Sequence, residues 1–107
     1  MTSDTRNKIA LITGGNRGLG KDMALSLAKL GMDIVLTFNS NPAEGEAVAQ
    51  EIRLSGGRAA ALRFDLSDTA AIDGFIDRLK ATLSETFDGA ERLDFLINNA
   101  GIGRPIP

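Results

Sequence analysis

The sequence lacks four residue types entirely: none of its 107 residues is tyrosine, histidine, cysteine or tryptophan. Without cysteine, disulfides and thiolate metal sites are excluded, and without histidine the common zinc sites are excluded too. A metal site built from carboxylates alone stays open, but no spacing of Asp and Glu suggests one. Because most side chains that transfer protons or attack substrates are missing, we identify no catalytic residue and no metal ligand.

A strong charge of one sign is also absent, as is any long apolar run. The formal net charge is −2, which provides no general attraction to nucleic acid or acidic membranes. No segment approaches the roughly 18 apolar residues of a membrane span. The polar residues Met1–Lys8 do not resemble a signal peptide. We therefore expect neither nucleic-acid nor membrane partners, and a cytoplasmic location.

What is present is an alternation of apolar runs and amphipathic segments, on a scale that fits one small domain. Buried strands are expected at Ile9–Thr13, Asp33–Phe38, Arg58–Phe64 and Leu93–Ile97. Helices are expected at Gly18–Leu30, from the cap Asn41 to Leu54, and from about Asp68 to Thr86. This order predicts an α/β fold, a Rossmann-type doubly wound parallel sheet in the strand order 3-2-1-4.

The last predicted strand would lie at an edge of this sheet. Its residues Phe95-Leu96-Ile97 are as apolar as those of a central strand, and an edge of that kind usually needs a neighbour. We therefore expect the sheet to be truncated after its fourth strand. Residues 1–107 would then form the N-terminal half of a larger single domain.

Two of the expected helices carry specific packing and capping signals. The first is predicted to bury one face, formed by the apolar residues that recur at helical intervals: Leu19, Met23, Leu27 and Leu30. The second begins at Asn41-Pro42-Ala43-Glu44. There Asn41 can cap the helix, Pro42 suits its first turn, and the Glu44 carboxylate can reach back to the Asn41 N–H.

Between the first strand and the first helix lies the glycine-rich turn Thr13-Gly14-Gly15-Asn16-Arg17-Gly18-Leu19-Gly20. A strand, a glycine-rich turn and a helix form the setting in which backbone N–H groups and a helix N-terminus hold a pyrophosphate. Gly14, Gly18 and Gly20 would allow a tight turn, close approach of the phosphates and close packing of helix on sheet. The alternative is a loop that uses glycine only to turn.

A nucleoside triphosphatase is a remote alternative. Gly15-x-x-x-x-Gly20-Lys21 matches all but the last position of a P-loop. The last position is Asp22, where Ser or Thr should coordinate magnesium and where an acid would repel phosphate. Arg63 also interrupts the apolar run that could serve as a second metal-binding strand, so we do not favour this alternative.

Three short motifs resemble those of the short-chain dehydrogenase/reductase family. Thr13-Gly14-x-x-x-Gly18-x-Gly20 is similar to the family's cofactor signature, and Asn98-Asn99-Ala100-Gly101 to its second signature. Asp65-Leu66, after the third strand, is similar to a shorter motif. The resemblance covers the chain from Lys8 to Gly101. It implies an oxidoreductase that transfers hydride between a nicotinamide dinucleotide and a small-molecule carbonyl or alcohol substrate.

The resemblance also implies roles for single residues around the dinucleotide. The pyrophosphate would be surrounded by the turn, with Gly14, Asn16, Arg17, Gly18, Leu19 and Gly20. Asp65 would hydrogen-bond the adenine amino group beside the Leu66 backbone, although capping of the next helix is an alternative for Asp65. Complete relatives commonly pair through elements that this chain does not contain, so the complete enzyme is expected to be a homo-oligomer.

The second signature would serve the other end of the dinucleotide. Asn98, Ala100 and Gly101 would line the adenosine and nicotinamide ribose side, while Asn99 would help to tie the fourth strand to the sheet. Ordinary turn chemistry is the alternative for the two asparagines, because Asn favours turns for its own reasons.

The choice between NADP and NAD can be argued from charge. An NAD-preferring site places an acid about 20 residues beyond the glycine turn, where it accepts from the ribose 2′-OH. Thr37 stands near that position, and no Asp or Glu lies between Ile34 and Pro42. Thr37, Asn39 and Ser40 could donate hydrogen bonds to a 2′-phosphate, and Arg17 could pair with it. We therefore expect NADP as the cofactor, with NAD less favoured; a solvated surface charge is the alternative for Arg17.

The family's catalytic Tyr-x-x-x-Lys would lie on a helix beyond the fourth strand, and this sequence contains no tyrosine. The 107 residues are therefore expected to be inactive alone. The first hypothesis is the cofactor-binding part of an NADP-dependent reductase. The second is a non-catalytic nucleotide-binding module or sensor.

Overall fold

The computed structural model describes residues 8–65, 70 and 72–99. Four parallel strands form one sheet in the order β3-β2-β1-β4. The strands are β1 (Ile9–Thr13), β2 (Asp33–Phe38), β3 (Ala59–Arg63) and β4 (Phe95–Asn98), and the helices are α1 (Gly18–Lys29), α2 (Pro42–Leu54) and α3 (Ile72–Thr86). The predicted doubly wound fold and strand order are confirmed.

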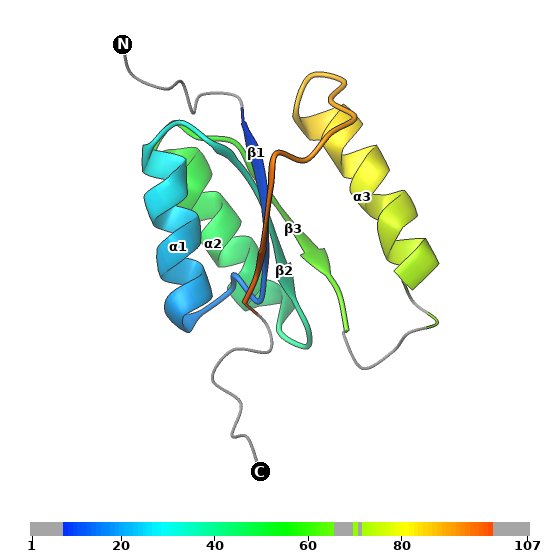
Figure 1. The fold of residues 1–107 in the computed structure, drawn as a ribbon. Coiled ribbons are helices and arrows are strands. Elements are labelled where there is room, and N and C mark those ends of the chain that lie inside the picture. Colours follow the sequence, from blue (N-terminus) through cyan, green and yellow to red (C-terminus); the bar gives the residue numbers. More distant parts are fainter. Residues whose placement is uncertain (1–7, 66–69, 71, 100–107) are drawn as a thin grey trace.

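The helices cover the two faces of the sheet unequally. Helices α1 and α2 lie on one face and α3 lies on the other (Figure 1). The core is accordingly divided into two clusters. One joins Ile12, Ile34 and Leu36 to α1 and α2, while the other joins Leu11 and Val35 to α3.

The two central strands are buried throughout, as their continuous apolar runs predict. Every residue of β1 and β2 is buried. Such burial on both faces is typical of a parallel sheet between helical layers. The outer strands are shorter than expected: β3 omits Arg58 and Phe64, and β4 begins at Phe95 rather than Leu93.

The packing predicted for α1 is partly wrong. Leu19 and Leu30 are 59% and 58% exposed, and the fully buried residues of the helix are Gly20 and Ala24. The physical reason is close approach: residues without large side chains face the sheet, so the helix backbone lies near the strands. Larger side chains then pack at the flanks, as Met23 and Leu27 do.

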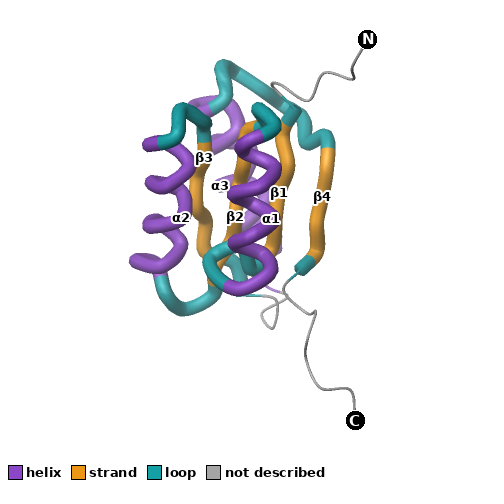
Figure 2. Tube along the Cα trace, turned by 90° about the vertical axis from the view of Figure 1, so that its left-hand side faces the viewer, coloured by secondary structure: helices purple, strands orange, loops and turns teal. Residues whose placement is uncertain are grey.

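Strand β4 forms one edge of the sheet, beside β1 (Figure 2). Its Phe95 and Leu96 side chains are 49% and 64% exposed. The predicted apolar edge is therefore present. Among the described residues, no helix is long and apolar enough to span a bilayer.

Candidate functional site

Most of the predicted binding residues gather at the carboxyl ends of the four strands. The glycine-rich turn follows β1, Asn39 and Ser40 follow β2, Asp65 lies shortly after β3, and Asn98 ends β4. Because parallel strands end at the same edge, the fold brings these separate segments together. Leu66, Ala100 and Gly101 lie outside the described residues.

The start of the glycine-rich turn is held from both neighbouring strands. The Gly14 N–H donates to the Thr37 hydroxyl at 3.0 Å, and the Gly15 N–H donates to the Thr37 carbonyl at 3.1 Å. From the other side, Asn99 Nδ2 donates to the Gly14 carbonyl at 3.2 Å. The backbone path of the turn is therefore fixed by the side chain and carbonyl of Thr37 in β2 and by the side chain of Asn99 after β4.

The end of β4 is locked to the end of β1 by a second group of hydrogen bonds. The Thr13 hydroxyl donates to Asn98 Oδ1 at 3.0 Å and accepts from the Asn99 N–H at 2.9 Å. Thr13 is buried, whereas its partner Asn98 is exposed, so these bonds are partly buried. The predicted role of Asn99 in tying the fourth strand to the sheet is confirmed.

Gly20 has no room for a side chain. A Cβ there would overlap the Gly14 carbonyl oxygen and the Asn99 side-chain amide. The absence of a side chain at this position therefore lets the first turn of α1 pack directly on the turn and on the residue after β4. This explains one of the three predicted glycine roles in terms of specific atoms.

Gly18 shows the opposite environment. Its φ is 59°, in the left-handed region that favours glycine, and nothing lies within 4 Å of the position that a Cβ would occupy. Helix α1 begins at this residue, without a side-chain cap from Arg17 and without an acid in its first turn. The open space therefore adjoins backbone N–H groups and the positive end of a helix dipole, which suits an anionic group.

The residues predicted to meet a 2′-phosphate differ in accessibility. Arg17, Asn39 and Ser40 are exposed, whereas Thr37 is only 2% exposed and its hydroxyl accepts from the turn. The structure gives Thr37 a role in shaping the turn. Its direct contact with a 2′-phosphate stays a prediction.

Two charged residues near this region were missed by the sequence analysis. Arg63, at the end of β3, donates from Nε to the Asn39 carbonyl at 2.9 Å. Glu44, in the first turn of α2, accepts from Asn16 Nδ2 at 2.5 Å. The pairing of Phe38 with Arg63 across the sheet follows from register, which the sequence alone does not specify.

The start of α2 confirms one capping prediction and corrects another. Asn41 Oδ1 accepts from the Glu44 N–H at 3.1 Å, as expected. The predicted return bond from the Glu44 carboxylate to the Asn41 N–H is wrong, because that carboxylate bonds to Asn16 instead. The Glu44 carboxylate therefore binds a residue of the glycine-rich turn, although the local sequence predicted a bond within its own helix.

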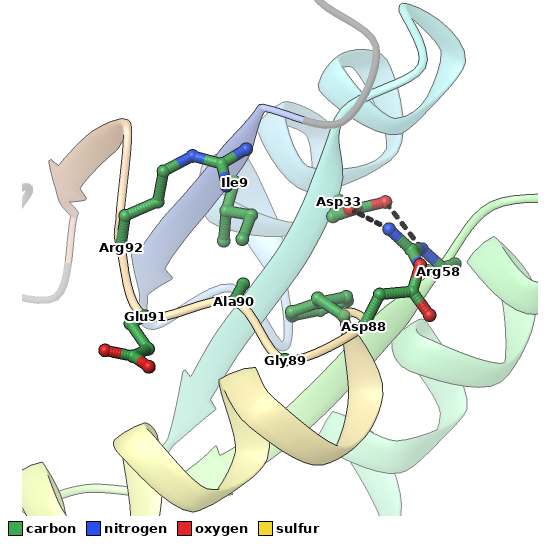
Figure 3. Close-up of a pocket in the computed structure, with 9 residues that line it drawn as sticks. Ile9, Asp33, Arg58, Asp88, Gly89, Ala90, Glu91 and Arg92 are labelled. Carbon is green, nitrogen blue, oxygen red and sulfur yellow. Dashed lines mark hydrogen bonds and ion pairs between the residues drawn. The ribbon is translucent and has the colours of Figure 1, made fainter.

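A hollow lies at the opposite, amino-terminal edge of the sheet (Figure 3). Its lining comes from the starts of β1 and β2, the residue before β3, and the segment after α3: Ile9, Asp33, Arg58, Phe87, Asp88, Gly89, Ala90, Glu91 and Arg92. None of these residues was predicted to bind a ligand. The hollow is therefore separate from the carboxyl edge described above.

Arg58 joins three segments at this edge. Its guanidinium donates to both oxygens of Asp33 at 3.1 and 2.7 Å and to Asp88 at 2.6 Å. It also lies over the Phe87 ring, 5.5 Å from the ring centroid. The hydrogen bonds to Asp33 and then to Asp88 raise the pKa of Arg58 above its usual range. These contacts pair Arg58, Asp33 and Asp88 with one another and connect β2 and the residue before β3 to the segment after α3.

Asp94 makes a related connection between β1 and the approach to β4. Its carboxylate accepts from the Ile9 N–H at 2.8 Å, while its own N–H donates to the Ile9 carbonyl at 2.9 Å. The hydrogen bond from Ile9, helped by the charges of Arg92 and Lys8, lowers the pKa of Asp94 below its ordinary value. Asp33, Arg58, Asp88 and Asp94 at this edge thus have structural partners.

Comparison with known families gives a match to the short chain dehydrogenase family over residues 8–107. The chain belongs to this family of oxidoreductases. Within this family, the chain is 37% identical over 97 residues to a 3-oxoacyl-[acyl-carrier-protein] reductase of Synechocystis, covering 91% of this chain and 36% of that protein. It is 35% identical over 101 residues to the short-chain dehydrogenase/reductase homolog YusS of Bacillus subtilis, covering 94% of this chain and 86% of YusS.

Solved structures of short-chain dehydrogenases have the same fold. The landomycin C-6 ketoreductase LanV with bound NADP and rabelomycin matches with a TM-score of 0.86 and 32% identity, covering 92% of this chain and 40% of LanV. A short-chain dehydrogenase from Burkholderia cenocepacia in complex with NADP matches with a TM-score of 0.76 and 38% identity, covering 95% and 39%. The chain spans little more than a third of the Synechocystis reductase and about two fifths of these two structures.

Proposed function

We propose that this chain forms the coenzyme-binding part of a short-chain dehydrogenase that transfers hydride between NADP(H) and a carbonyl or alcohol substrate. The observation that carries the proposal is the glycine-rich turn, whose space beside Gly18 opens onto the uncapped start of α1. NADP-bound relatives of the same fold support the choice of ligand. A nicotinamide coenzyme would supply the hydride.

The residues of the turn fit the pyrophosphate of such a coenzyme. The hydrogen bonds that Gly14 and Gly15 donate to Thr37, and the one that Asn99 donates to Gly14, hold this backbone in place, so the turn is organised in advance of binding. We expect the turn from Gly14 to Gly20, with Asn16, Arg17, Gly18 and Leu19, to surround the two phosphates. The N–H donors would come from Asn16 onward, because the N–H groups of Gly14 and Gly15 already donate to Thr37. Preorganised donors bind an anion without a further loss of backbone entropy.

The other predicted contacts extend along the same edge. Asp65 and Leu66 would hold the adenine, and Asn98, Ala100 and Gly101 the riboses. Arg17, Asn39 and Ser40 would meet the 2′-phosphate, because all three are exposed beside the turn. NADP is therefore our proposed coenzyme. A cytoplasmic location and a homo-oligomeric complete enzyme also stay predictions.

No residue of the chain is proposed to move the proton that accompanies hydride transfer. The sequence contains no tyrosine, histidine or cysteine, so we expect the 107 residues to bind coenzyme without turnover. The second candidate is a non-catalytic nucleotide-binding module, which the same binding residues would serve. A reading frame that continues beyond Pro107 into Tyr-x-x-x-Lys would support the enzyme, and a stop codon would support the module. The family assignment leaves the triphosphatase alternative without support.

Arg17→Glu tests the proposed coenzyme preference. The change replaces a guanidinium that can pair with the 2′-phosphate by a carboxylate that repels it. We expect the Kd for NADPH to rise at least tenfold and the Kd for NADH to rise only about twofold, measured by titration of coenzyme fluorescence.

Lys29→Glu is the matched control, because it makes the same charge change at the far end of α1. It is expected to leave both constants within about twofold of the wild-type values. Equal losses for NADPH and NADH in Arg17→Glu would remove the case for 2′-phosphate recognition. Absence of NADPH binding by the wild-type chain would contradict the proposed function itself.

A further inference from the structure

Glu44 places a carboxylate beside the glycine-rich turn from a distant part of the sequence. Its Oε1 accepts from Asn16 Nδ2 at 2.5 Å, across a separation of 28 residues. Both residues are half-buried. No acid lies between Ile34 and Pro42, which favours NADP, but Glu44 lies just beyond that segment. The fold therefore places a carboxylate beside the glycine-rich turn, although the expected position of such an acid in the sequence holds none.

The charges around this region are mixed. Exposed Arg17 follows Asn16 directly, and Arg63 bonds to the carbonyl of Asn39, another residue expected to meet a 2′-phosphate. These two guanidinium groups attract a 2′-phosphate, whereas the Glu44 carboxylate repels it. A ribose 2′-hydroxyl behaves differently, because it can donate a hydrogen bond to a carboxylate. The balance between the two coenzymes thus depends on the charge at residue 44.

We propose that Glu44 determines coenzyme specificity and lets the site accept NADH alongside NADPH. This proposal rests on the proposed function. The carboxylate weakens binding of the 2′-phosphate by repulsion and offers an acceptor to the 2′-hydroxyl of NADH. In NAD-preferring sites the acid follows the glycine turn by about 20 residues. Here it comes from the first turn of α2, and the hydrogen bond from Asn16 holds it toward the turn.

A purely structural role for Glu44 makes a different prediction. If the Asn16–Glu44 bond served only to join α2 to the turn, any acceptor of the same shape would suffice. Glutamine preserves the shape and an acceptor oxygen but removes the charge. Glu44→Gln therefore separates an electrostatic effect on coenzyme choice from a mechanical effect on the turn.

The experiment measures the ratio of the NADH and NADPH dissociation constants in wild-type protein, Glu44→Gln and Glu51→Gln. Titrations follow coenzyme fluorescence at low ionic strength, where screening is weak. Glu51 is an exposed residue of the same helix, so its change to Gln alters the net charge equally. We expect Glu44→Gln to raise the ratio, in favour of NADPH, about fivefold, as for removal of one solvent-screened repulsion. Glu51→Gln should leave the ratio within about twofold of wild type.

Glu44→Lys provides a second measurement of how the charge at residue 44 affects the ratio of the two dissociation constants. Reversing the charge should raise the ratio further, beyond that of Glu44→Gln, even if both affinities change through the lost bond to Asn16. A ratio that is unchanged or lower in Glu44→Gln and Glu44→Lys would overturn the role of Glu44 alone. Failure of wild-type protein to bind either coenzyme would overturn the proposed function and this inference together.

Discussion

The two ends of the sheet are built from different interactions. At the carboxyl end, neutral side chains such as Thr13, Thr37 and Asn99 bond to the backbone and shape an open turn. At the amino end, Asp33, Arg58 and Asp88 pair through full charges. The amino end uses its charges to join segments, whereas the carboxyl end leaves an uncapped helix start available to an anion. The charged contacts that join segments and the turn proposed to bind coenzyme therefore lie at opposite edges of this fold.

The largest effect is expected from Gly20→Ala at the carboxyl end. The new Cβ would overlap the Gly14 carbonyl and the Asn99 amide, so α1 would have to move off the turn. We expect a loss of about 2–3 kcal/mol in the free energy of unfolding. The Kd for NADPH should rise at least tenfold, roughly 1.4 kcal/mol of binding free energy. Urea denaturation and coenzyme titration check the two values.

Gly74→Ala is the control for that substitution. Gly74 lies inside α3, where a Cβ would meet only Arg78 Nη1, at 3.9 Å. Alanine should therefore stabilise the protein by about 0.5–1 kcal/mol through helix propensity, without changing the Kd for NADPH. Similar destabilisation by both alanine substitutions would contradict the close packing assigned to Gly20.

At the amino end, Asp33→Asn should have a smaller effect, confined to stability. Asp33 is nearly buried, with a side chain that is 7% exposed, and it accepts two bonds from Arg58. We expect a loss of about 1–2 kcal/mol in the free energy of unfolding with an unchanged Kd for NADPH. Asp88→Asn makes the same change at a side chain that is 85% exposed, and should stay within about 0.5 kcal/mol of wild type. A weakened Kd in Asp33→Asn would break the proposed separation of the two ends.

The smallest effect, and the one with a defined pH dependence, belongs to Asp94. Because its pKa is lower in the folded chain than its ordinary value of 3.8, its carboxylate stabilises the fold above that value. This stabilisation is lost as the pH falls through the folded-state pKa. Asp94→Asn should therefore unfold at a lower temperature than wild type near pH 7, with the difference narrowing below about pH 4. A difference that widened on acidification would contradict the assigned direction.

The sequence predicts the sheet well, because continuous apolar runs indicate strands that are buried on both faces and glycines indicate the turns between elements. The burial of β1 and β2 and the strand order all follow from such patterns. The exposed Leu19 and Leu30 were mispredicted, since periodicity identifies an apolar face but not how near the helix approaches the sheet. That distance is set by Gly20 and Ala24.

The candidate site is predicted less completely than the fold. The glycine-rich turn, Asn98 and Asn99 are recognisable because their spacing is local. Glu44 and Arg63 are not, because their positions depend on contacts between segments far apart in the chain. Local capping rules even assigned Glu44 to a different partner. Charged residues that reach such a site from neighbouring elements can therefore be located only from the three-dimensional structure.

The most direct test is a titration of ¹⁵N-labelled protein with NADPH, followed by the backbone amide signals in two-dimensional NMR spectra. We predict that the signals of Gly14 to Gly20 shift in a saturable manner, because the pyrophosphate binds in this turn. The signals of Arg58 and of Asp88 to Arg92, at the amino end, should stay in place. Saturable shifts at the amino end with none in the glycine-rich turn would contradict it.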